Sequence, residues 1–300
     1  MMPWERKLDE WIPPGLLEGG KYASKELREA YKEKVIQKPL PKEPTPQATR
    51  SFEEMYMKAI PVVEEVFPPV ASQPPEMDDL DRFARRHNSD KWAHGFTAVY
   101  SKLFDRVHTN SLLEIGVDSG ASLRMWSDWF DHSVPLHGFD LKEYAPGKFG
   151  KEVSTYVCDQ GNRQELYAQL MKIGGGGKWF DIVIDDGSHW QEHMQNTLGF
   201  LWQCVNPGGY YVVEDLHVCV HPDRGGSALE FQGSHMLPDE ANSTLLLLEA
   251  WAQGNWAKSR YMLDGEMERI RDSAEWVKVY RPLDTNRHIT CVIKKREVQV

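Results

Sequence analysis

The chain has 300 residues, of which 41% are hydrophobic and 27% charged, and its formal net charge is -10. This length and apolar content predict one large core or two modest ones, while the surplus of carboxylates disfavours nucleic acid as a partner. No apolar run approaches the roughly 18 residues of a membrane helix, and the amino terminus, MMPWERKLDEW, has no signal-peptide pattern. With four widely spaced cysteines, these features predict a soluble cytoplasmic protein with free thiols and no membrane partner.

The first 75 residues differ in texture from the rest of the chain. KPLPKEPTP at 38–46 is punctuated by prolines, as a linker or extended arm is, and 51–67 carries a helical apolar stripe. We expect residues 1–75 to form a mainly helical and linker region that covers a site or mediates homo-oligomerisation. Residues 76–300 are then expected to form the main domain.

From residue 110 onward, short apolar runs alternate with helical stretches. We expect strands in SLLEIGV, LHGFDL, STYVCD, DIVIDD and GYYVVEDL, and helices that include ASLRMWSDWF, NRQELYAQLMKI and WQEHMQNTLGFLWQCV. Such alternation predicts a parallel sheet covered on both faces. VKVYRP and HITCVIKK, near the carboxyl terminus, predict an antiparallel hairpin at the edge of the sheet. The expected fold is therefore α/β, with a Rossmann-like, doubly wound sheet of seven mostly parallel strands. An insertion at 221–275 is expected near the active site, as part of a lid.

The loop after the first of these strands is rich in glycine. LLEIGVDSGAS, at 112–122, runs from a strand through a turn into a helix, which brings backbone N–H groups close to a ligand. It is not a phosphate-binding Walker loop, because no Lys-Ser/Thr follows Gly120. Asp118 stands where a dinucleotide fingerprint needs its middle glycine. What remains is E-x-G-x-x-x-G, formed by Glu114, Gly116 and Gly120, and its acidic residue suits a cationic or polyhydroxyl ligand.

Two further strand ends carry polar residues. Asp140 ends the second strand, where a carboxylate can bind ribose hydroxyls, and Asp159 and Gln160 follow the third, where an acceptor can reach an adenine amino group. In this order the motifs resemble the class I S-adenosylmethionine-dependent methyltransferases. The resemblance implies that Glu114 and the two glycines hold the amino-acid end of S-adenosylmethionine. It also implies that Asp140 binds the ribose and that Asp159 and Gln160 lie near the adenine.

Four carboxylates end the fourth and fifth strands: Asp185 and Asp186 in DIVIDD, and Glu214 and Asp215 in YYVVED. Neighbouring parallel strands would bring them to the carboxyl edge of the sheet, near the cofactor. Carboxylates that converge without a basic partner repel one another unless a cation lies among them. Oxygen ligands suit a hard ion such as Mg²⁺, which could hold a substrate hydroxyl. His189, three residues past Asp186, is a candidate general base.

The DDGSH motif also allows simpler interpretations. Ser188 and Gln191 have the spacing of a capping box, so the motif could be a helix start with a histidine in its first turn. HWQEH, at 189–193, fits the inverted zinc-peptidase pattern H-x-x-E-H, although the remaining motifs have no role in a peptidase. A protein that binds S-adenosylmethionine without catalysis is a third possibility.

IDDGSH followed by PGGYYVVED resembles the metal-dependent sugar O-methyltransferases of macrolide biosynthesis, of the mycinamicin VI 2''-O-methyltransferase type. The resemblance implies that Asp186, Glu214 and Asp215 bind Mg²⁺ and that His189 is the base. SDKWAHGFTAVYSKLF, at 89–104, is similar to a segment of the same family and implies that Lys91 and His94 lie near the cofactor. The expected activity is Mg²⁺-assisted O-methylation of a sugar-bearing small molecule. A catechol-type enzyme is the alternative, but a dedicated histidine base better suits a sugar hydroxyl.

Overall fold

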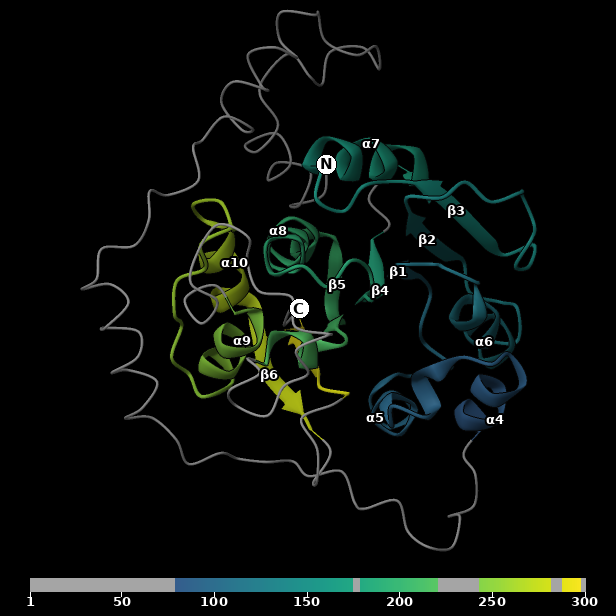
Figure 1. Ribbon diagram of the computed structural model, residues 1–300, viewed down its shortest axis with the longest axis horizontal. Helices are drawn as coiled ribbons and strands as arrows, with labels where there is room; N and C mark the ends of the chain where they lie inside the picture. Colours follow the sequence, from purple (N-terminus) through teal and green to yellow (C-terminus); the bar gives the residue numbers. More distant parts are fainter. Residues whose placement is uncertain (1–78, 175–178, 221–242, 282–287, 298–300) are drawn as a thin grey trace, which may run out of the picture. The chain divides into compact units, whose positions relative to one another are not determined.

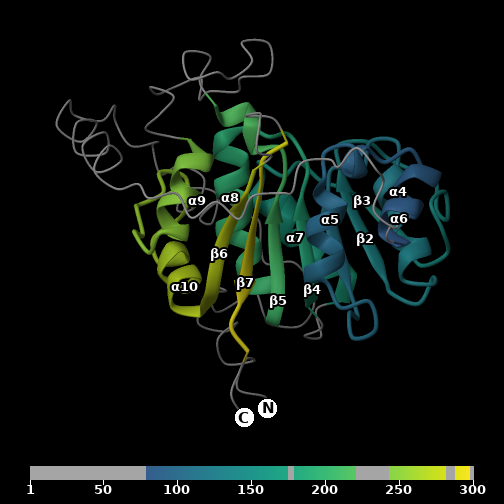
Figure 2. The same cartoon turned by 90° about the horizontal axis from the view of Figure 1, so that it is seen from below.

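The computed structural model describes residues 79–174, 179–220, 243–281 and 288–297. These residues form a seven-stranded sheet in the order β3-β2-β1-β4-β5-β7-β6 (Figures 1 and 2). The strands are β1 (Leu112–Ile115), β2 (Leu136–Asp140), β3 (Val153–Val157), β4 (Phe180–Asp185), β5 (Val205–Val213), β6 (Ala274–Tyr280) and β7 (Thr290–Lys295). The expected region 1–75 and the first part of the insertion, 221–242, lie outside the described residues.

Six strands run in the same direction and β7 alone runs antiparallel to them, so the sheet is mostly parallel, as the sequence predicted. β1 lies between β2 and β4 and pairs with both in parallel, while β7 runs antiparallel between β5 and β6. All four residues of β1 are buried, because helices cover both faces of the sheet at this position. The Rossmann-like expectation and the terminal hairpin are therefore confirmed.

The helices lie in two layers, one on each face of the sheet (Figures 1 and 2). One layer contains α4 (Asp79–Arg86), α5 (Phe96–Leu103) and α6 (Ala121–Trp129), and the other contains α7 (Arg163–Gly174), α8 (Gln191–Leu201), α9 (Thr244–Ala252) and α10 (Glu266–Ser273). Short 3-10 helices are η2 (Asp90–Trp92), η3 (Trp202–Cys204) and η4 (Leu216–Cys219). The first layer packs on the sheet through a cluster of large buried side chains that includes Tyr100, Trp126 and Phe130.

Two boundaries differ from the sequence expectation. The helix expected to continue through Val205 ends at Leu201, and Val205 instead begins β5, where it pairs with Phe180 of β4. Within the described part of the insertion, α9 packs against β6 and α10 against α8. These two helices therefore extend the second layer of helices.

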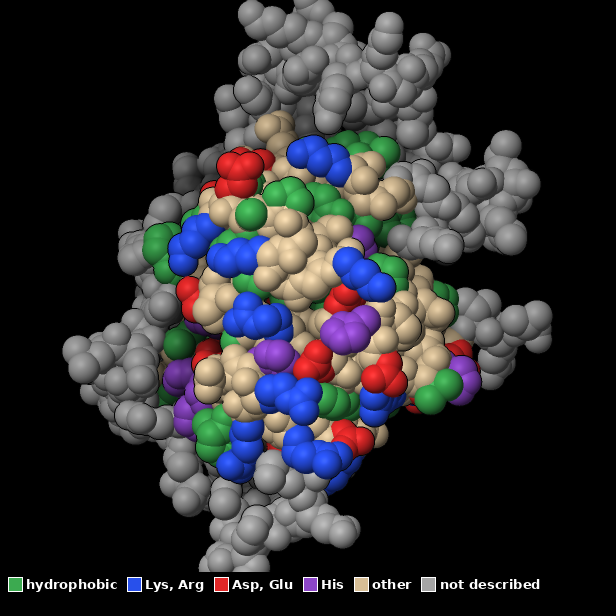
Figure 3. Space-filling model, turned by 90° about the vertical axis from the view of Figure 1, so that its right-hand side faces the viewer, with side chains coloured by type: hydrophobic (Ala, Val, Ile, Leu, Met, Phe, Trp, Pro, Cys, Tyr) green, Lys and Arg blue, Asp and Glu red, His purple; other side chains and the backbone are tan. Residues whose placement is uncertain are grey.

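The face that carries α4 and α6 is mixed in charge. Lys and Arg side chains gather on it, with Asp, Glu and His side chains among them (Figure 3). Several of these groups are paired, including Arg86 with Asp128, and Arg106 with both Asp79 and Asp131. None of the described helices combines the length and the apolar character needed to cross a membrane.

Candidate active site

A cavity of about 520 Å³ lies at the carboxyl ends of β1, β2 and β4. Its volume falls in the range of small-molecule and cofactor sites. Of the residues singled out from the sequence, its lining includes Gly116, Asp140, Asp159, Gln160, Asp186, His189 and Asp215. The segment before α5 contributes Asn88, Ser89 and Asp90, of which Ser89 and Asp90 begin the segment 89–104 singled out from the sequence.

The glycine loop needs its glycines for close packing. Gly116 has a φ of +89°, and a Cβ there would overlap the carbonyl oxygen of Asp186. Gly120 has a φ of +75°, and a Cβ there would overlap the ring of Phe149. Any larger residue would be strained at both positions. Because Gly116 has no side chain, the loop can lie directly against the end of β4. Gly120 itself does not line the cavity, and it affects only the conformation of the loop.

Glu114 also lies behind the loop. Its side chain is fully buried and accepts a hydrogen bond from the Ser122 hydroxyl at 2.8 Å. Burial raises the pKa of Glu114, while the nearby ammonium group of Lys91 opposes that shift. Because Glu114 is absent from the cavity lining, its predicted contact with a cofactor requires a ligand that reaches deeper than the cavity does here.

Asp140 orients the loop. Its Oδ2 accepts hydrogen bonds from the backbone N–H groups of Val117 and Asp118, at 2.9 and 3.0 Å, and its Oδ1 accepts one from the N–H of Lys142 at 2.8 Å. Burial alone would raise the pKa of Asp140, but these hydrogen bonds lower it below its ordinary value. The carboxylate is therefore ionised and fixed at the cavity wall, as a group that binds ribose hydroxyls must be.

Gln160 and Asp185 form a buried pair. The Gln160 amide donates to Asp185 Oδ1 at 3.0 Å, and its Oε1 accepts from the N–H of Ser188. Burial raises the pKa of Asp185 to about 6. Asp185, which was predicted near the cofactor, is outside the cavity lining because its side chain turns to Gln160 and to the hydroxyl of Tyr211. Asp159 remains in the lining, and its Oδ1 caps the N–H of Gly161.

The assumption that the carboxylates converge without a basic partner was wrong. Lys91 of η2 is 1% exposed, and its Nζ lies 2.6 Å from Glu214 Oε2, 2.7 Å from Asp186 Oδ2 and 3.2 Å from Glu114 Oε1. Burial alone would lower the pKa of Lys91, but the three carboxylates raise it well above its ordinary value. The sequence suggested that Lys91 lies near the cofactor, but spacing along the chain gave no sign of this three-way contact.

Glu214 is held on both of its oxygens. Oε2 accepts from Lys91, and Oε1 accepts from the hydroxyl of Tyr100 at 2.6 Å. The side chain is almost fully buried, and burial raises the pKa of Glu214. Asp186 and Asp215 consequently present the more accessible carboxylate oxygens of the predicted metal-binding set.

Asp186 and Asp215 of this set, together with the predicted base His189, form a group that could hold an ion. His189 Nε2 lies 3.9 Å from Asp186 Oδ1 and 3.8 Å from Asp215 Oδ2, and one donor atom from each residue falls within 4.8 Å of the others. Burial and the charge of Asp186 raise the pKa of Asp215. A divalent cation would oppose this shift, so the geometry and charge fit a hard metal ion.

The backbone is strained at the same place. His189 and Asp215 adopt left-handed conformations, with φ values of 57° and 54°. Non-glycine residues rarely adopt this region, and such strain tends to persist at functional sites. The sequence reveals the residue types here but not the strain that aims them into the cavity.

The alternatives for DDGSH are not supported by the geometry. Helix α8 begins at Gln191 with Trp190 as its N-cap residue, so the expected capping box does not form. His189 therefore precedes the helix, and His193 instead bonds with the Ser188 hydroxyl. The two histidines of HWQEH do not share a helix face, which is what the zinc-peptidase pattern requires.

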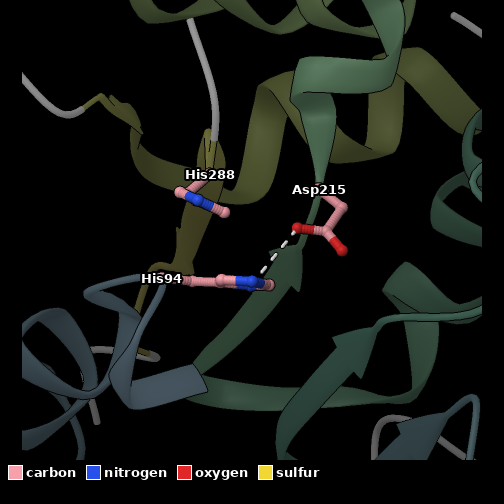
Figure 4. A group of neighbouring side chains, drawn as sticks. All are labelled: His94, Asp215 and His288. Carbon is pink, nitrogen blue, oxygen red and sulfur yellow. Dashed lines mark ion pairs between the residues drawn. The ribbon is translucent and has the colours of Figure 1, made fainter. Parts of the chain in front are cut away.

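Asp215 also faces histidines on its other side (Figure 4). His94 Nδ1 lies 3.8 Å from Asp215 Oδ1, and His217 Nδ1 lies 3.6 Å from the same oxygen. The ring of His288, which precedes β7, stacks on that of His94 at 3.9 Å between centroids. His288 was not indicated by any sequence motif, because it comes from a segment far from Asp215 along the chain.

Comparison with known proteins supports the sequence-based resemblance of the central segment to methyltransferases. Residues 113–216 match the family model of a methyltransferase domain, which spans the glycine loop, DDGSH and Glu214-Asp215. Over these residues the chain is similar to a methyltransferase domain. The chain is 36% identical over 186 residues to the 8-demethyl-8-(2-methoxy-alpha-L-rhamnosyl)-tetracenomycin-C 3'-O-methyltransferase of Streptomyces olivaceus. It is 33% identical over 162 residues to the mycinamicin VI 2''-O-methyltransferase of Micromonospora griseorubida. The sequence-based resemblance is thereby confirmed.

A solved structure extends the similarity to the fold. The MycE methyltransferase of the mycinamycin pathway, in complex with Mg, SAH and mycinamycin VI, aligns with a TM-score of 0.54 and 25% identity. The alignment covers 74% of this chain and 56% of the MycE chain. Of the two curated relatives, the chain covers 45% and 39%. About half of each relative therefore has no counterpart in the match, and the methyltransferase domain is what is shared.

Proposed function

We propose that the methyltransferase domain transfers a methyl group from S-adenosylmethionine to a hydroxyl group of a sugar-bearing small molecule, with the help of Mg²⁺. The observation that carries the proposal is the convergence of Asp186, His189 and Asp215 at one wall of the cavity. The names of the similar proteins, which are sugar O-methyltransferases of natural-product biosynthesis, support the acceptor class.

The cavity lining supports a place for the cofactor. The Gly116 loop and the fixed carboxylate of Asp140 are suited to S-adenosylmethionine, and Asp159 lies at the same wall. When bound, S-adenosylmethionine supplies an electrophilic methyl group. The protein's task is then to hold the acceptor oxygen in line with that methyl group and to keep water away from it.

The histidine base has a clear task in this reaction. A sugar hydroxyl is a weak nucleophile, so its proton must leave as the new bond to carbon forms. His189 lines the cavity, and its Nε2 faces the two aspartates at 3.8 and 3.9 Å. It can accept that proton, while Asp186 and Asp215 would hold the ion, which would lower the pKa of the hydroxyl. Glu214, also predicted as a metal ligand, supports them through Lys91.

His189→Ala tests the role of the base. We expect turnover to fall by about 10²–10⁴-fold, because that is the usual contribution of a positioned general base. Affinity for S-adenosylhomocysteine should stay nearly unchanged, because the glycine loop and Asp140 remain intact. Methyl transfer to glycosylated acceptors and calorimetric binding of S-adenosylhomocysteine measure the two properties separately.

His193→Ala is the matched control, because His193 also lines the cavity but bonds with Ser188. It should lose much less activity than His189→Ala. Loss of S-adenosylhomocysteine binding in His189→Ala would instead assign His189 to the cofactor site. Full methyl transfer by the unaltered chain in excess EDTA would refute the metal's part in the proposal.

A further inference from the structure

We propose that His94, Asp215 and His288 form a second metal site, for a zinc-type ion, on the side of Asp215 that faces away from Asp186. One donor atom from each of the three residues lies within 4.8 Å of the others. The three come from distant parts of the chain: the segment before α5, the end of β5 and the start of β7 (Figure 4). The inference does not depend on the methyl-transfer proposal, because the ligand set would bind an ion whatever the reaction.

The two carboxylate oxygens of Asp215 face two different groups of possible metal ligands. Oδ2 faces His189 at 3.8 Å, within the group that includes Asp186. Oδ1 faces His94 Nδ1 at 3.8 Å and is buried without a hydrogen-bond partner among the described residues. A carboxylate can bind one ion through each oxygen. The two groups can therefore be occupied together rather than in turn.

The ligand types distinguish the two sites. The Asp186 side offers mainly carboxylate oxygen, which suits Mg²⁺. The His94 side offers two imidazoles and one carboxylate oxygen, and imidazole favours Zn²⁺ and neighbouring transition metals. Two histidines and one carboxylate, with a fourth position open, is also a ligand set of catalytic zinc sites. Nitrogen and oxygen ligands bind Zn²⁺ at about 2.0–2.2 Å, so the three donors, which lie within 4.8 Å of one another, need to move closer together when the ion binds.

The backbone is strained at two of the three residues. Asp215 and His288 both adopt left-handed conformations, with φ values of 54° and 57°. Strain of this kind is kept where surrounding structure aims a side chain at a function. The rings of His94 and His288 are nearly parallel, at 20°, and their centroids are 3.9 Å apart. One of the two rings must therefore turn when both imidazoles bind the same ion, so the site forms as the ion binds.

Zinc binding by the whole chain tests the inference. Calorimetric titration with ZnCl₂, in buffer saturated with Mg²⁺ to fill the oxygen-rich group, should give one equivalent of tight binding. His288→Ala and His94→Ala should each weaken that binding by at least about tenfold, since each removes a direct ligand. His108→Ala is the matched control, because His108 is exposed and pairs only with Asp105 among the described contacts. It should bind zinc like the unaltered chain.

The outcomes separate this inference from its rivals. Equal zinc affinity in a folded His288→Ala variant, judged by its circular dichroism melt, would overturn the proposed site. So would the absence of zinc binding by the unaltered chain. Loss of zinc in His189→Ala but not in His288→Ala would place the ion in the Asp186 group and also overturn it. Binding of S-adenosylhomocysteine, titrated in the same samples, tests the methyltransferase proposal independently.

Discussion

At the scale of single residues, a buried ammonium group organises the candidate site. Lys91 Nζ joins Glu114 of β1, Asp186 after β4 and Glu214 after β5, and so ties together the ends of three neighbouring strands. Without it, three carboxylates would face one another, two of them, Glu114 and Glu214, fully buried. Lys91 therefore neutralises the inner carboxylates, while Asp186 and Asp215 stay accessible from the cavity.

Replacement of Lys91 by methionine tests this role. The variant keeps the length of the side chain but removes its charge, so we expect a loss of about 3–5 kcal/mol in the free energy of unfolding, the usual cost of breaking a buried ion pair. Urea unfolding monitored by circular dichroism measures it. Lys102→Met, at an exposed position of α5, is the control and should change stability by less than about 0.5 kcal/mol. A loss of less than 1 kcal/mol in Lys91→Met would contradict the account.

The residue types of the site could be predicted from the sequence, but their partners could not. Asp186, His189 and Asp215 were indicated because they follow strands whose ends meet at one sheet edge. The contacts of Lys91 and the approach of His288 depend on side-chain directions, which no spacing along the chain encodes. Asp185 shows why the partners could not be predicted. Side chains alternate along a strand, so Asp185 points to Gln160 while its neighbour Asp186 faces the cavity.

At the scale of elements, β2 carries a histidine, His137, whose protonation makes the free energy of unfolding depend on pH. His137 is half-buried beside the rings of Tyr156 and Phe180, and burial lowers its pKa to about 4. The folded chain thus keeps His137 neutral where the unfolded chain, with a pKa near 6.5, takes up a proton. Stability from this residue is fully present above about pH 6.5 and is lost as pH falls toward 4.

His137→Asn should remove that dependence. Between pH 7 and pH 5 the unaltered chain should lose about 1–2 kcal/mol more unfolding free energy than the variant, after allowance for the partial exposure of the ring. Urea unfolding of both proteins at the two pH values gives the difference. Parallel pH profiles for the two proteins would show that His137 titrates alike in the folded and unfolded chains.

The elements themselves followed from pattern, but their ends did not. Alternation of apolar runs and helical stretches predicted β1 to β5, because parallel strands covered on both faces read as short apolar segments. Two strand-like runs near the carboxyl terminus predicted β6 and β7 as a hairpin. Helix α8 starts at Gln191 and ends at Leu201, although the apolar period continues to Val205. At the end of α8, the pairing of Val205 with Phe180 in the sheet overrides the helical preference of the local sequence.

At the scale of the whole molecule, the described residues form the mostly parallel seven-stranded sheet with a terminal hairpin that was expected from the sequence, and residues 113–216 match a methyltransferase domain. The domain brings the glycine loop, Asp140 and the Asp186 group to one cavity. The sequence could indicate this because each motif follows a strand of the same parallel sheet. The roles expected for residues 1–75 and for a lid in 221–242 concern parts outside the described residues and stay predictions.

The central claim, that this cavity binds S-adenosylmethionine beside a divalent ion, is tested most directly by calorimetric titration of the full chain with S-adenosylhomocysteine, with and without Mg²⁺. The account predicts one equivalent of micromolar binding in both conditions, because the glycine loop and Asp140 hold the ligand without the metal. It also predicts methyl transfer to a glycosylated acceptor only when Mg²⁺ is present. The absence of S-adenosylhomocysteine binding in both conditions would contradict the claim.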